Sequence, residues 1–203
     1  LSLALLNAKT KEEAARLAGD LTALNQSRKA LTEKGKEEAI RIIETTELKN
    51  DRVLVVYLPD CHESLAGIIA GRIREKYHRP AFVLTGGETS AKGSGRSIES
   101  YSMYEELVKC ADLMIQFGGH PMAAGLSIEE KNIEEFRRRL NVNCTLTDEE
   151  LRPKIVIDVP MPVSYITKEL VEQISLLEPF GKGNTKPVFA QKNLRVLDHS
   201  IIG

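Results

Sequence analysis

The sequence predicts an α/β protein in which a long N-terminal helix precedes a sheet with flanking helices. Three observations carry this prediction. Residues 10–47 repeat small apolar side chains at helical spacing. Residues 52–59 and 80–86 are continuous apolar runs rich in β-branched residues, and a helical pattern over 62–77 separates them. Hydrophobic residues make up 42% of the chain and charged residues 28%, which are ordinary values for a globular protein.

The N-terminal helix is expected to begin at a capping box made by Thr10 and Glu13. Gly35 could bend or break the helix. A helix that continues to Thr46 would be about 50 Å long at about 1.5 Å per residue. That length exceeds what one small domain needs, so the helix is interpreted as a strut between two bodies.

The central part of the chain predicts a βαβ unit followed by shorter elements. The two apolar runs should be parallel strands joined by a right-handed crossover. Beyond them we expect a strand or loop at 90–98, a helix at 103–113, an extended segment at 113–117, a strand at 123–128 and a helix at 129–140. These elements supply a sheet whose last strands surround a glycine-rich stretch.

The C-terminal part reads as the start of another domain. Residues 141–153 are polar and predict a linker. A strand at 154–159, a helix at 167–180 and β structure over 188–203 follow. The last pattern stops in mid-element, and the chain begins with Leu1, so we expect a piece of a longer protein.

Composition excludes several classes of function. No run of about 18 apolar residues is present, so no membrane span is expected. The three cysteines are far apart and odd in number, which argues against structural zinc and a disulfide framework and favours a reducing cytoplasm. The net charge is only −1, so any nucleic acid must bind through a local basic patch.

The segment "KGSGRS" offers the chemistry that a phosphate requires. Its glycines let backbone N–H groups approach a ligand, Lys92 and Arg96 add charge, and Ser94 and Ser97 add hydroxyl donors. It is not a Walker loop, because Ala91 stands where that motif needs glycine. The alternative interpretation is a flexible surface turn.

The segment "FGGHPMAAG" leaves the backbone bare around one imidazole. Gly118 and Gly119 remove side chains beside His120, and the small residues 123–125 keep the neighbouring face flat. His120 could then donate to a phosphate oxygen or transfer a proton. The alternative is a tight turn that contains a satisfied histidine.

Two further sites carry weaker signals. His62 opens the helix over 62–77, and a helix N-terminus can bind an anion, while Glu63 would complement the helix dipole. A zinc motif HExxH is excluded, because Ala66 fills its second histidine position. Arg28 lies three residues from Asn25 on one helix face, a spacing equally typical of a solvated surface.

The segment "LEPFGKGNTKP" over 177–187 is expected to be a tight junction between helix and strand. Its two lysines, Lys182 and Lys186, could also contact a nucleic-acid backbone.

Taken together, these segments resemble a known family. "HESLAGIIAGRI", "KGSGRS" and "FGGHPMAAGLS" resemble, in order and spacing, the signature segments of the DHHA1 domain. "LN..R" and "L.PFG.GN.KP.F" resemble flanking segments of RecJ, the single-strand-specific DNA exonuclease of the DHH superfamily. The resemblance covers nearly the whole chain. The "GGHxxAAG" pattern alone is shared with oligoribonucleases and cyclic-dinucleotide phosphodiesterases, whereas "LEPFGKGN" favours RecJ.

The resemblance implies an architecture and an activity. It implies a connecting helix over 1–47, a DHHA1 domain with a mixed sheet flanked by helices over 48–142, and a linker with a partial OB-like β domain over 143–203. RecJ enzymes degrade single-stranded DNA from its 5′ end in DNA repair and recombination, with Mn²⁺ or Mg²⁺ held by a DHH domain. The motif of that domain is not found in this chain, so the fragment alone is expected to be inactive and to bind no metal.

The resemblance also implies roles for single residues. His120 would be catalytic, and the residues that contact the substrate or its phosphate would be Arg96, Ser94, Ser97, Gly118, Gly119, His62, Lys92 and Arg28. The implied partner is single-stranded DNA, with single-strand-binding protein as a family expectation. The chain departs from the family at Cys61, where an aromatic residue is common, and at Ser64, which replaces a glycine.

Two rival functions stay open at this point. A phosphodiesterase for oligoribonucleotides or cyclic dinucleotides would not need the segment after residue 154. A tRNA-binding appendage, like the DHHA1 piece of alanyl-tRNA synthetase, would lack an upstream metal site.

Overall fold

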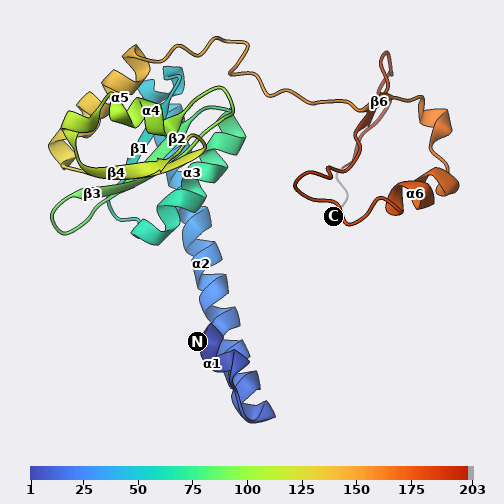
Figure 1. Ribbon diagram of the computed structural model, residues 1–203, viewed down its shortest axis with the longest axis horizontal. Helices are drawn as coiled ribbons and strands as arrows, with labels where there is room; N and C mark the ends of the chain where they lie inside the picture. The colour runs from blue at the N-terminus through green and yellow to red at the C-terminus, as the bar shows by residue number, and fades with distance from the viewer. Residues whose placement is uncertain (201–203) are drawn as a thin grey trace. The chain divides into compact units, whose positions relative to one another are not determined.

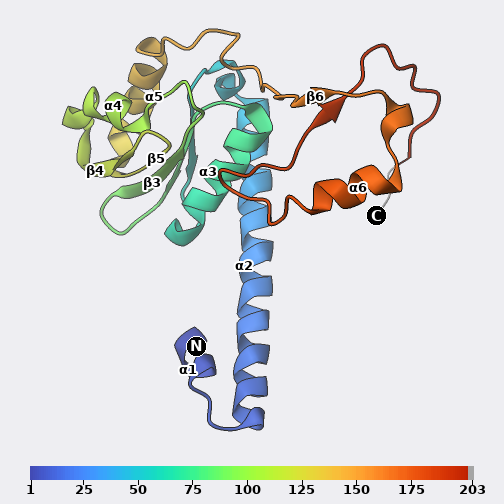
Figure 2. The ribbon, with the colours of Figure 1, turned by 45° about the vertical axis from the view of Figure 1, so that its right-hand side comes forward.

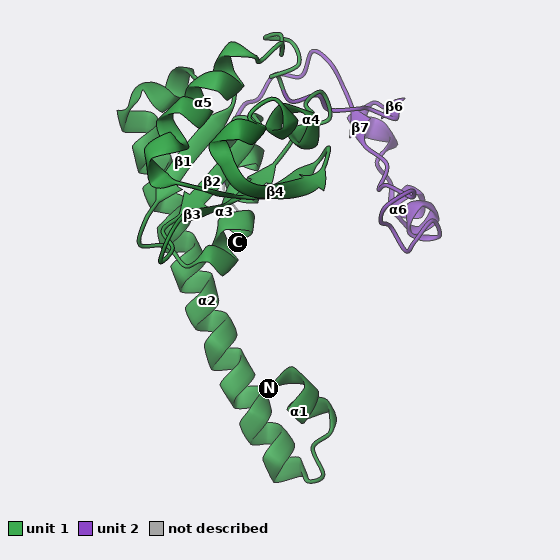
Figure 3. Ribbon diagram, turned by 60° about the vertical axis from the view of Figure 1, so that its left-hand side comes forward, with its two compact units in different colours: residues 1–152 green, residues 153–203 purple. Residues whose placement is uncertain are grey.

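The computed structural model describes residues 1–200. It divides into two compact units, residues 1–152 and residues 153–203 (Figure 3). The first unit is a mixed α/β structure with a long N-terminal helix, which confirms the predicted fold class. Among the described residues, no helix has both the length and the apolar character needed to cross a bilayer.

Helix α2 (Lys11–Thr45) is continuous, with the short helix α1 (Ser2–Leu6) packed against it (Figure 2). The Thr10 side chain accepts a hydrogen bond from the Glu13 backbone N–H at 3.1 Å, which confirms this half of the predicted capping box. The Glu13 side chain accepts instead from the Lys9 backbone N–H at 3.0 Å. Gly35 neither bends nor breaks the helix. A Cβ atom at Gly35 would come within 2.6 Å of Ile69 Cδ1, so the glycine allows close packing against the next helix.

The first unit contains a five-stranded mixed sheet. The strands are β1 (Leu54–Leu58), β2 (Ala81–Thr85), β3 (Ala91–Arg96), β4 (Met114–His120) and β5 (Ala123–Ile128). Their order in the sheet is β1-β2-β3-β5-β4. Figure 1 labels β1 to β4, and Figure 2 labels β5. Strands β1 and β2 are parallel and are joined through α3 (Glu63–Tyr77), as predicted. The other neighbouring pairs are antiparallel.

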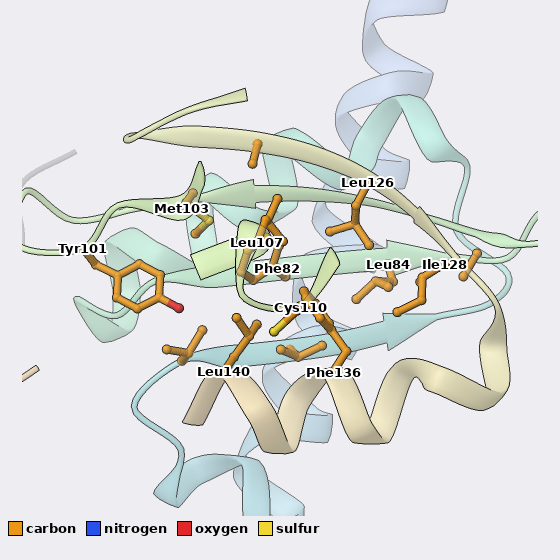
Figure 4. Close-up of a cluster of buried hydrophobic side chains, with 14 of the residues drawn as sticks. Phe82, Leu84, Tyr101, Met103, Leu107, Cys110, Leu126, Ile128, Phe136 and Leu140 are labelled. Carbon is orange, nitrogen blue, oxygen red and sulfur yellow. The ribbon is translucent and has the colours of Figure 1, made fainter. Parts of the chain in front are cut away.

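Helices cover both faces of the sheet. Ala39 and Ile43 of α2 and the apolar side of α3 pack on one face of β1 and β2. Helix α4 (Met103–Val108) and helix α5 (Ile133–Val142) pack on the opposite face. There Phe136 of α5 meets Phe82 of β2 edge to face, with ring centroids 5.4 Å apart (Figure 4). The two clusters make this sheet the middle layer of three.

The glycine-rich segment 91–96 is the central strand β3 and not a loop. Glycine is required there because α4 and β2 pack closely against the strand: a Cβ at Gly95 would lie 2.6 Å from both Met103 Sδ and Phe82 Cε1.

The two helices predicted at 103–113 and 129–140 are shorter than expected or shifted along the chain. The helix predicted at 103–113 ends at Val108 and gives way to a 3₁₀ turn, Ala111–Leu113. The helix predicted at 129–140 begins as the 3₁₀ turn Glu130–Asn132.

The polar segment after α5 is packed onto the first unit. Leu146 is buried in the cluster of the α5 side, and its carbonyl oxygen accepts a hydrogen bond from Arg52 Nη1. Asn141 Oδ1 accepts hydrogen bonds from the backbone N–H groups of Arg52 and Val53, and its Nδ2 donates to the carbonyls of Val53 and Arg137. These bonds tie the end of α5 to the start of β1.

The second unit contains helix α6 (Lys168–Ser175), a 3₁₀ turn (Val163–Tyr165) and a parallel pair of β6 (Val159–Pro160) with β7 (Phe189–Ala190). The predicted strands over 154–159 and 188–200 are therefore much shorter than expected, and the predicted helix ends at Ser175. None of the residues described in this unit is buried. Strands without a packed apolar face gain little stability, which accounts for the short ladder. Residues 201–203, the end of the predicted β segment, lie outside the described part.

The "LEPFGKGN" segment forms the predicted tight junction. Gly181 and Asn184 exchange two backbone hydrogen bonds, at 2.8 and 3.1 Å. Gly183 at the tip has φ +86°, a conformation that glycine adopts without strain. The Asn184 side-chain amide donates to the carbonyls of Leu177 and Pro179, which holds the preceding residues to the turn.

Candidate nucleic-acid interface

A groove lies beside α3 on the first unit. Helix α3 packs over β2 and β3, whereas Gly118 of β4 and Gly125 of β5 are exposed. The groove has a volume of about 540 Å³. Its lining comprises Glu63, Ser64, Ala66, Lys92, Gly93, Ser94, Gln116, Phe117, Gly118, Gly125, Leu126 and Ser127.

The strand register arranges the polar residues of this face in rows. Residues directly opposite in an antiparallel pair project to the same face, and alternate residues of a strand share that face. The rows across β3, β5 and β4 are Arg96–Ala123–His120, Ser94–Gly125–Gly118 and Lys92–Ser127–Gln116. Arg96 and His120 therefore stand on one face, two strand spacings or about 10 Å apart.

The glycines of β4 and β5 differ in their surroundings. A Cβ at Gly118 would meet nothing within 4 Å, and one at Gly125 would meet only the Gly93 carbonyl oxygen at 3.8 Å. Neither glycine is thus required by the packing of this chain, and together they expose bare main chain to the groove. Gly119 differs, because it has φ +151° and a Cβ there would lie 2.4 Å from the Ala123 carbonyl oxygen. Gly119 is a requirement of the hairpin.

Ser94 and Arg96 meet against α3. Arg96 Nη1 donates to the Gly95 carbonyl oxygen at 2.7 Å. A Cβ at Gly67 would lie 2.8 Å from Arg96 Nη2 and 3.5 Å from Ser94 Oγ, so this glycine of α3 makes room for the guanidinium. Gly67 was not among the predicted site residues. A glycine in a helix interior is less favourable than alanine by about 1 kcal/mol, and its presence in the helical pattern of 62–77 was the available signal.

An ion pair crosses the groove. Lys92 Nζ of β3 lies 2.7 Å from Glu63 Oε2 of α3, and the two side chains are 56% and 51% exposed. The hydrogen bond from Lys92 lowers the pKa of Glu63, and the same contact raises the pKa of Lys92. Glu63, predicted only to complement the helix dipole, therefore also neutralises a cation of the groove.

His120 lies at the end of β4, exposed and just outside the groove lining. Its Nδ1 accepts a hydrogen bond from the Met122 backbone N–H at 3.3 Å, across the turn formed by Pro121 and Met122. Within residues 1–200, Nε2 makes no hydrogen bond. The histidine thus stands in the tight turn that was the alternative prediction, but one of its ring nitrogens has no hydrogen-bond partner among residues 1–200.

The remaining predicted residues do not line the groove. Ser97 is 2% exposed, and its hydroxyl donates to the Tyr101 carbonyl oxygen at 2.5 Å. His62 caps α3: its Nδ1 accepts from the Ser64 backbone N–H at 3.2 Å. Arg28 is exposed on α2 and does not line the groove. The structure thus brings Lys92, Ser94 and Gly118 together, with Arg96 and His120 at one end.

The residues described here do not form a metal site. Within positions 1–200, no three histidine, cysteine, aspartate or glutamate side chains are grouped as metal ligands are. The groove itself contributes a single carboxylate, Glu63, which is paired with Lys92. Mn²⁺ and Mg²⁺ prefer several oxygen ligands, so this set does not fit either ion.

Two family models match the chain. The model of the DHHA1 domain matches residues 50–144, and the model of the RecJ OB domain matches residues 157–203. The groove, with β1 to β5 and α3, lies within the first match. The second match covers most of the second unit.

Similarity over nearly the whole of this chain points the same way. The single-stranded-DNA-specific exonuclease RecJ of Bacillus subtilis is 35% identical over 203 residues, covering 98% of this chain and 26% of that protein. The RecJ of Escherichia coli is 34% identical over 213 residues, covering 100% of this chain and 37% of that protein. The crystal structure of RecJ in complex with Mg²⁺ from Thermus thermophilus superposes with a TM-score of 0.77 at 29% identity, covering 92% of this chain and 29% of that one.

The chain thus spans about a quarter to somewhat over a third of these relatives (26–37%). A second solved structure of the Thermus protein contains Mn²⁺. These matches favour RecJ over the oligoribonuclease or cyclic-dinucleotide phosphodiesterase considered above, because the model of the RecJ OB domain matches the chain in addition to the DHHA1 model.

Proposed function

Because the chain belongs to the RecJ family of single-stranded-DNA-specific exonucleases, we propose that it is the DNA-binding part of a 5′–3′ exonuclease. In this proposal the groove beside α3 clamps the 5′ end of the strand. The observation that carries it is the shared face of β3, β5 and β4, on which Arg96 and His120 stand in one row beside the bare glycines.

The groove residues suit a phosphate at the strand end. Arg96 presents a planar guanidinium that binds phosphate oxygens through two N–H groups, and the Ser94 hydroxyl beside it adds a donor. Gly118 and Gly125 let the sugar-phosphate chain approach the main chain without a steric clash. His120, which is exposed and whose Nε2 makes no hydrogen bond within residues 1–200, is the proposed catalytic residue that donates to the scissile region.

Hydrolysis itself is assigned to a DHH domain, whose motif is not found in this chain. The ion that RecJ structures contain, Mg²⁺ or Mn²⁺, would be held by a DHH domain, and residues 1–200 offer no ligand cluster for it. The chain alone is therefore proposed to bind single-stranded DNA without cleaving it.

We also propose a division of the chain into a connecting helix (1–47), a DHHA1 domain (48–142) and a linker with a partial OB-like domain (143–203). A cytoplasmic setting is part of the same proposal, and the three free cysteines suit a reducing compartment.

The test compares two oligonucleotides that differ only at the 5′ end. By fluorescence anisotropy, the chain should bind a 5′-phosphorylated single strand more tightly than the 5′-hydroxyl form, and Arg96→Ala should abolish the difference. Arg138→Ala is the matched control, because Arg138 is an exposed arginine of α5, on the opposite face of the sheet. Equal binding of the two oligonucleotides by the unmodified chain would overturn the clamp.

Salt provides an independent readout. Binding through phosphate contacts releases counterions, so the affinity should fall with rising salt. Arg96→Ala should flatten that dependence by about one contact, whereas Arg138→Ala should leave it unchanged.

A further inference from the structure

The charges that line the groove come from a single ion pair. Of the lining residues, only Glu63 and Lys92 are charged, and they bind each other at 2.7 Å. A groove proposed to hold a polyanion therefore contains a carboxylate on its own wall. Neither strand packing nor the α3 helix cap requires that carboxylate, since His62 already supplies the cap.

The position of Lys92 makes this pairing consequential. Lys92 lies two residues before Ser94 on the same face of β3, or about 7 Å along the strand. Its ammonium group is thus a third donor next to Ser94 and Arg96. While Glu63 holds it, that donor is engaged with a carboxylate and not with a ligand.

An exposed ion pair of this kind opens readily, because solvent screens it and holding two long side chains together has an entropic cost. A competing anion can therefore take Lys92 from Glu63, and the stronger the charge, the more complete the exchange. A terminal phosphate monoester carries a charge of about −1.5 to −2 near neutral pH. An internal phosphodiester carries one negative charge and competes less well.

We propose that Glu63 is an affinity-limiting residue that competes with phosphate for Lys92, so that a terminal phosphate is held less tightly than Lys92 would otherwise allow. This inference rests on the proposed function of the groove and goes beyond it. The dianionic end displaces the carboxylate most completely, and it therefore bears the largest share of the free energy needed to separate Lys92 from Glu63. The ion pair thus lowers the affinity for a terminal phosphate at least as much as the affinity for a strand without one.

The experiment measures the affinity of the 203-residue chain for 5′-phosphorylated and 5′-hydroxyl oligonucleotides in four variants. These are Glu63→Gln, Lys92→Gln, the double variant, and Glu75→Gln as the matched control. Glu75 lies on the same helix, is 50% exposed and pairs with Arg72 at 3.0 Å. It stands twelve residues beyond Glu63, or about 18 Å along the axis.

Glu63→Gln should tighten binding of the 5′-phosphorylated strand about fivefold, the size expected from removing one exposed unit charge a few ångströms away in water. Binding of the 5′-hydroxyl strand should tighten less, because that strand displaces Glu63 less completely, so the preference for the phosphate grows. In the Lys92→Gln background, Glu63→Gln should have little effect on the ratio. Glu75→Gln should match the unmodified chain.

The failures are distinguishable. If the unmodified chain binds both strands equally, the clamp itself is wrong. If the unmodified chain discriminates but Glu63→Gln leaves the ratio unchanged, the clamp stands and the role of Glu63 is overturned. An equal effect of Glu63→Gln with and without Lys92 also overturns it, because competition for that lysine is then not the cause. Circular dichroism of each variant shows that the fold is retained.

Discussion

Gly118 and Gly119 are neighbours in β4, yet a methyl group added to each would meet a different environment. At Gly118 it would enter the open groove, whereas at Gly119 it would meet the Ala123 carbonyl oxygen at 2.4 Å. Gly119→Ala should therefore lower the free energy of unfolding by about 2 kcal/mol or more, through strain at a positive φ. Gly118→Ala should leave stability within about 0.5 kcal/mol and weaken binding of single-stranded DNA.

Urea denaturation and anisotropy titration check the two effects separately. If Gly118→Ala binds DNA as well as the unmodified chain does, the strand does not lie on the bare main chain at Gly118 and Gly125.

Gly67 of α3 offers a test of how Arg96 is positioned. Gly67→Ala should raise the free energy of unfolding by up to about 1 kcal/mol from helix propensity, less any cost of moving the guanidinium. Because the new methyl group would lie 2.8 Å from Arg96 Nη2, the arginine must shift, and discrimination of the 5′ phosphate should fall.

The matched control is Gly71→Ala on the same helix, where a Cβ would meet nothing within 4 Å. It should gain the same stability and keep the discrimination. Loss of discrimination in both variants would mean that the helix, and not the room beside Arg96, is responsible.

Much of the candidate site could be predicted from residue types alone. The alternation of Lys92, Ser94 and Arg96 puts three donors on one face wherever the segment is a strand. Burial of Ser97 could not be predicted, because it depends on where β3 ends and on the loop that brings the Tyr101 carbonyl to its hydroxyl. The pairing of Glu63 with Lys92 needs the tertiary contact between α3 and β3, which no local pattern encodes.

At the scale of elements, β3 was the hardest to predict. Glycine normally weakens a strand, so a segment with two glycines among six residues fits a strand or a loop equally well. The packing of neighbouring side chains explains why this strand contains glycine. Gly95 lies so close to Met103 and Phe82 that no larger side chain fits there. The parallel pair β1 and β2, by contrast, was predictable because continuous apolar runs are typical of strands buried on both faces.

The junction of α5 with β1 makes a prediction for stability. Asn141→Ala should lower the free energy of unfolding by about 2–3 kcal/mol, because the backbone N–H groups of Arg52 and Val53 lose their acceptor in a partly buried position. Urea denaturation measures the change.

Asn143→Ala serves as the control, since Asn143 makes no side-chain hydrogen bond among residues 1–200. Its free energy of unfolding should stay within about 0.5 kcal/mol of the unmodified chain. Similar losses in the two variants would contradict the anchoring role of Asn141.

At the scale of the whole molecule, the two units differ in how they are stabilised. Every buried apolar residue described lies between Leu17 and Leu146, in the first unit. Ile155, Val156, Leu176 and Leu197 of the second unit are between 77% and 85% exposed. The sequence predicted a second domain there, but its apolar pattern alone could not show whether the residues present suffice to bury one another.

A chain that ends at Arg152 should therefore keep the thermal transition of the first unit. The expected change in Tm is less than about 2 °C, because none of residues 153–200 belongs to either buried cluster. Differential scanning calorimetry of the shortened and complete chains makes the comparison. A large drop in Tm would show that the second unit stabilises the first.

The bare floor formed by Gly118 and Gly125 has a consequence for base preference. Peptide groups look alike at every position, so a surface made of them presents no pattern of donors and acceptors that tells adenine from cytosine. A nucleotide resting there is sensed by its backbone and its outline only. Such a surface accepts any base composition with equal ease, which suits the proposed role on strands of arbitrary sequence.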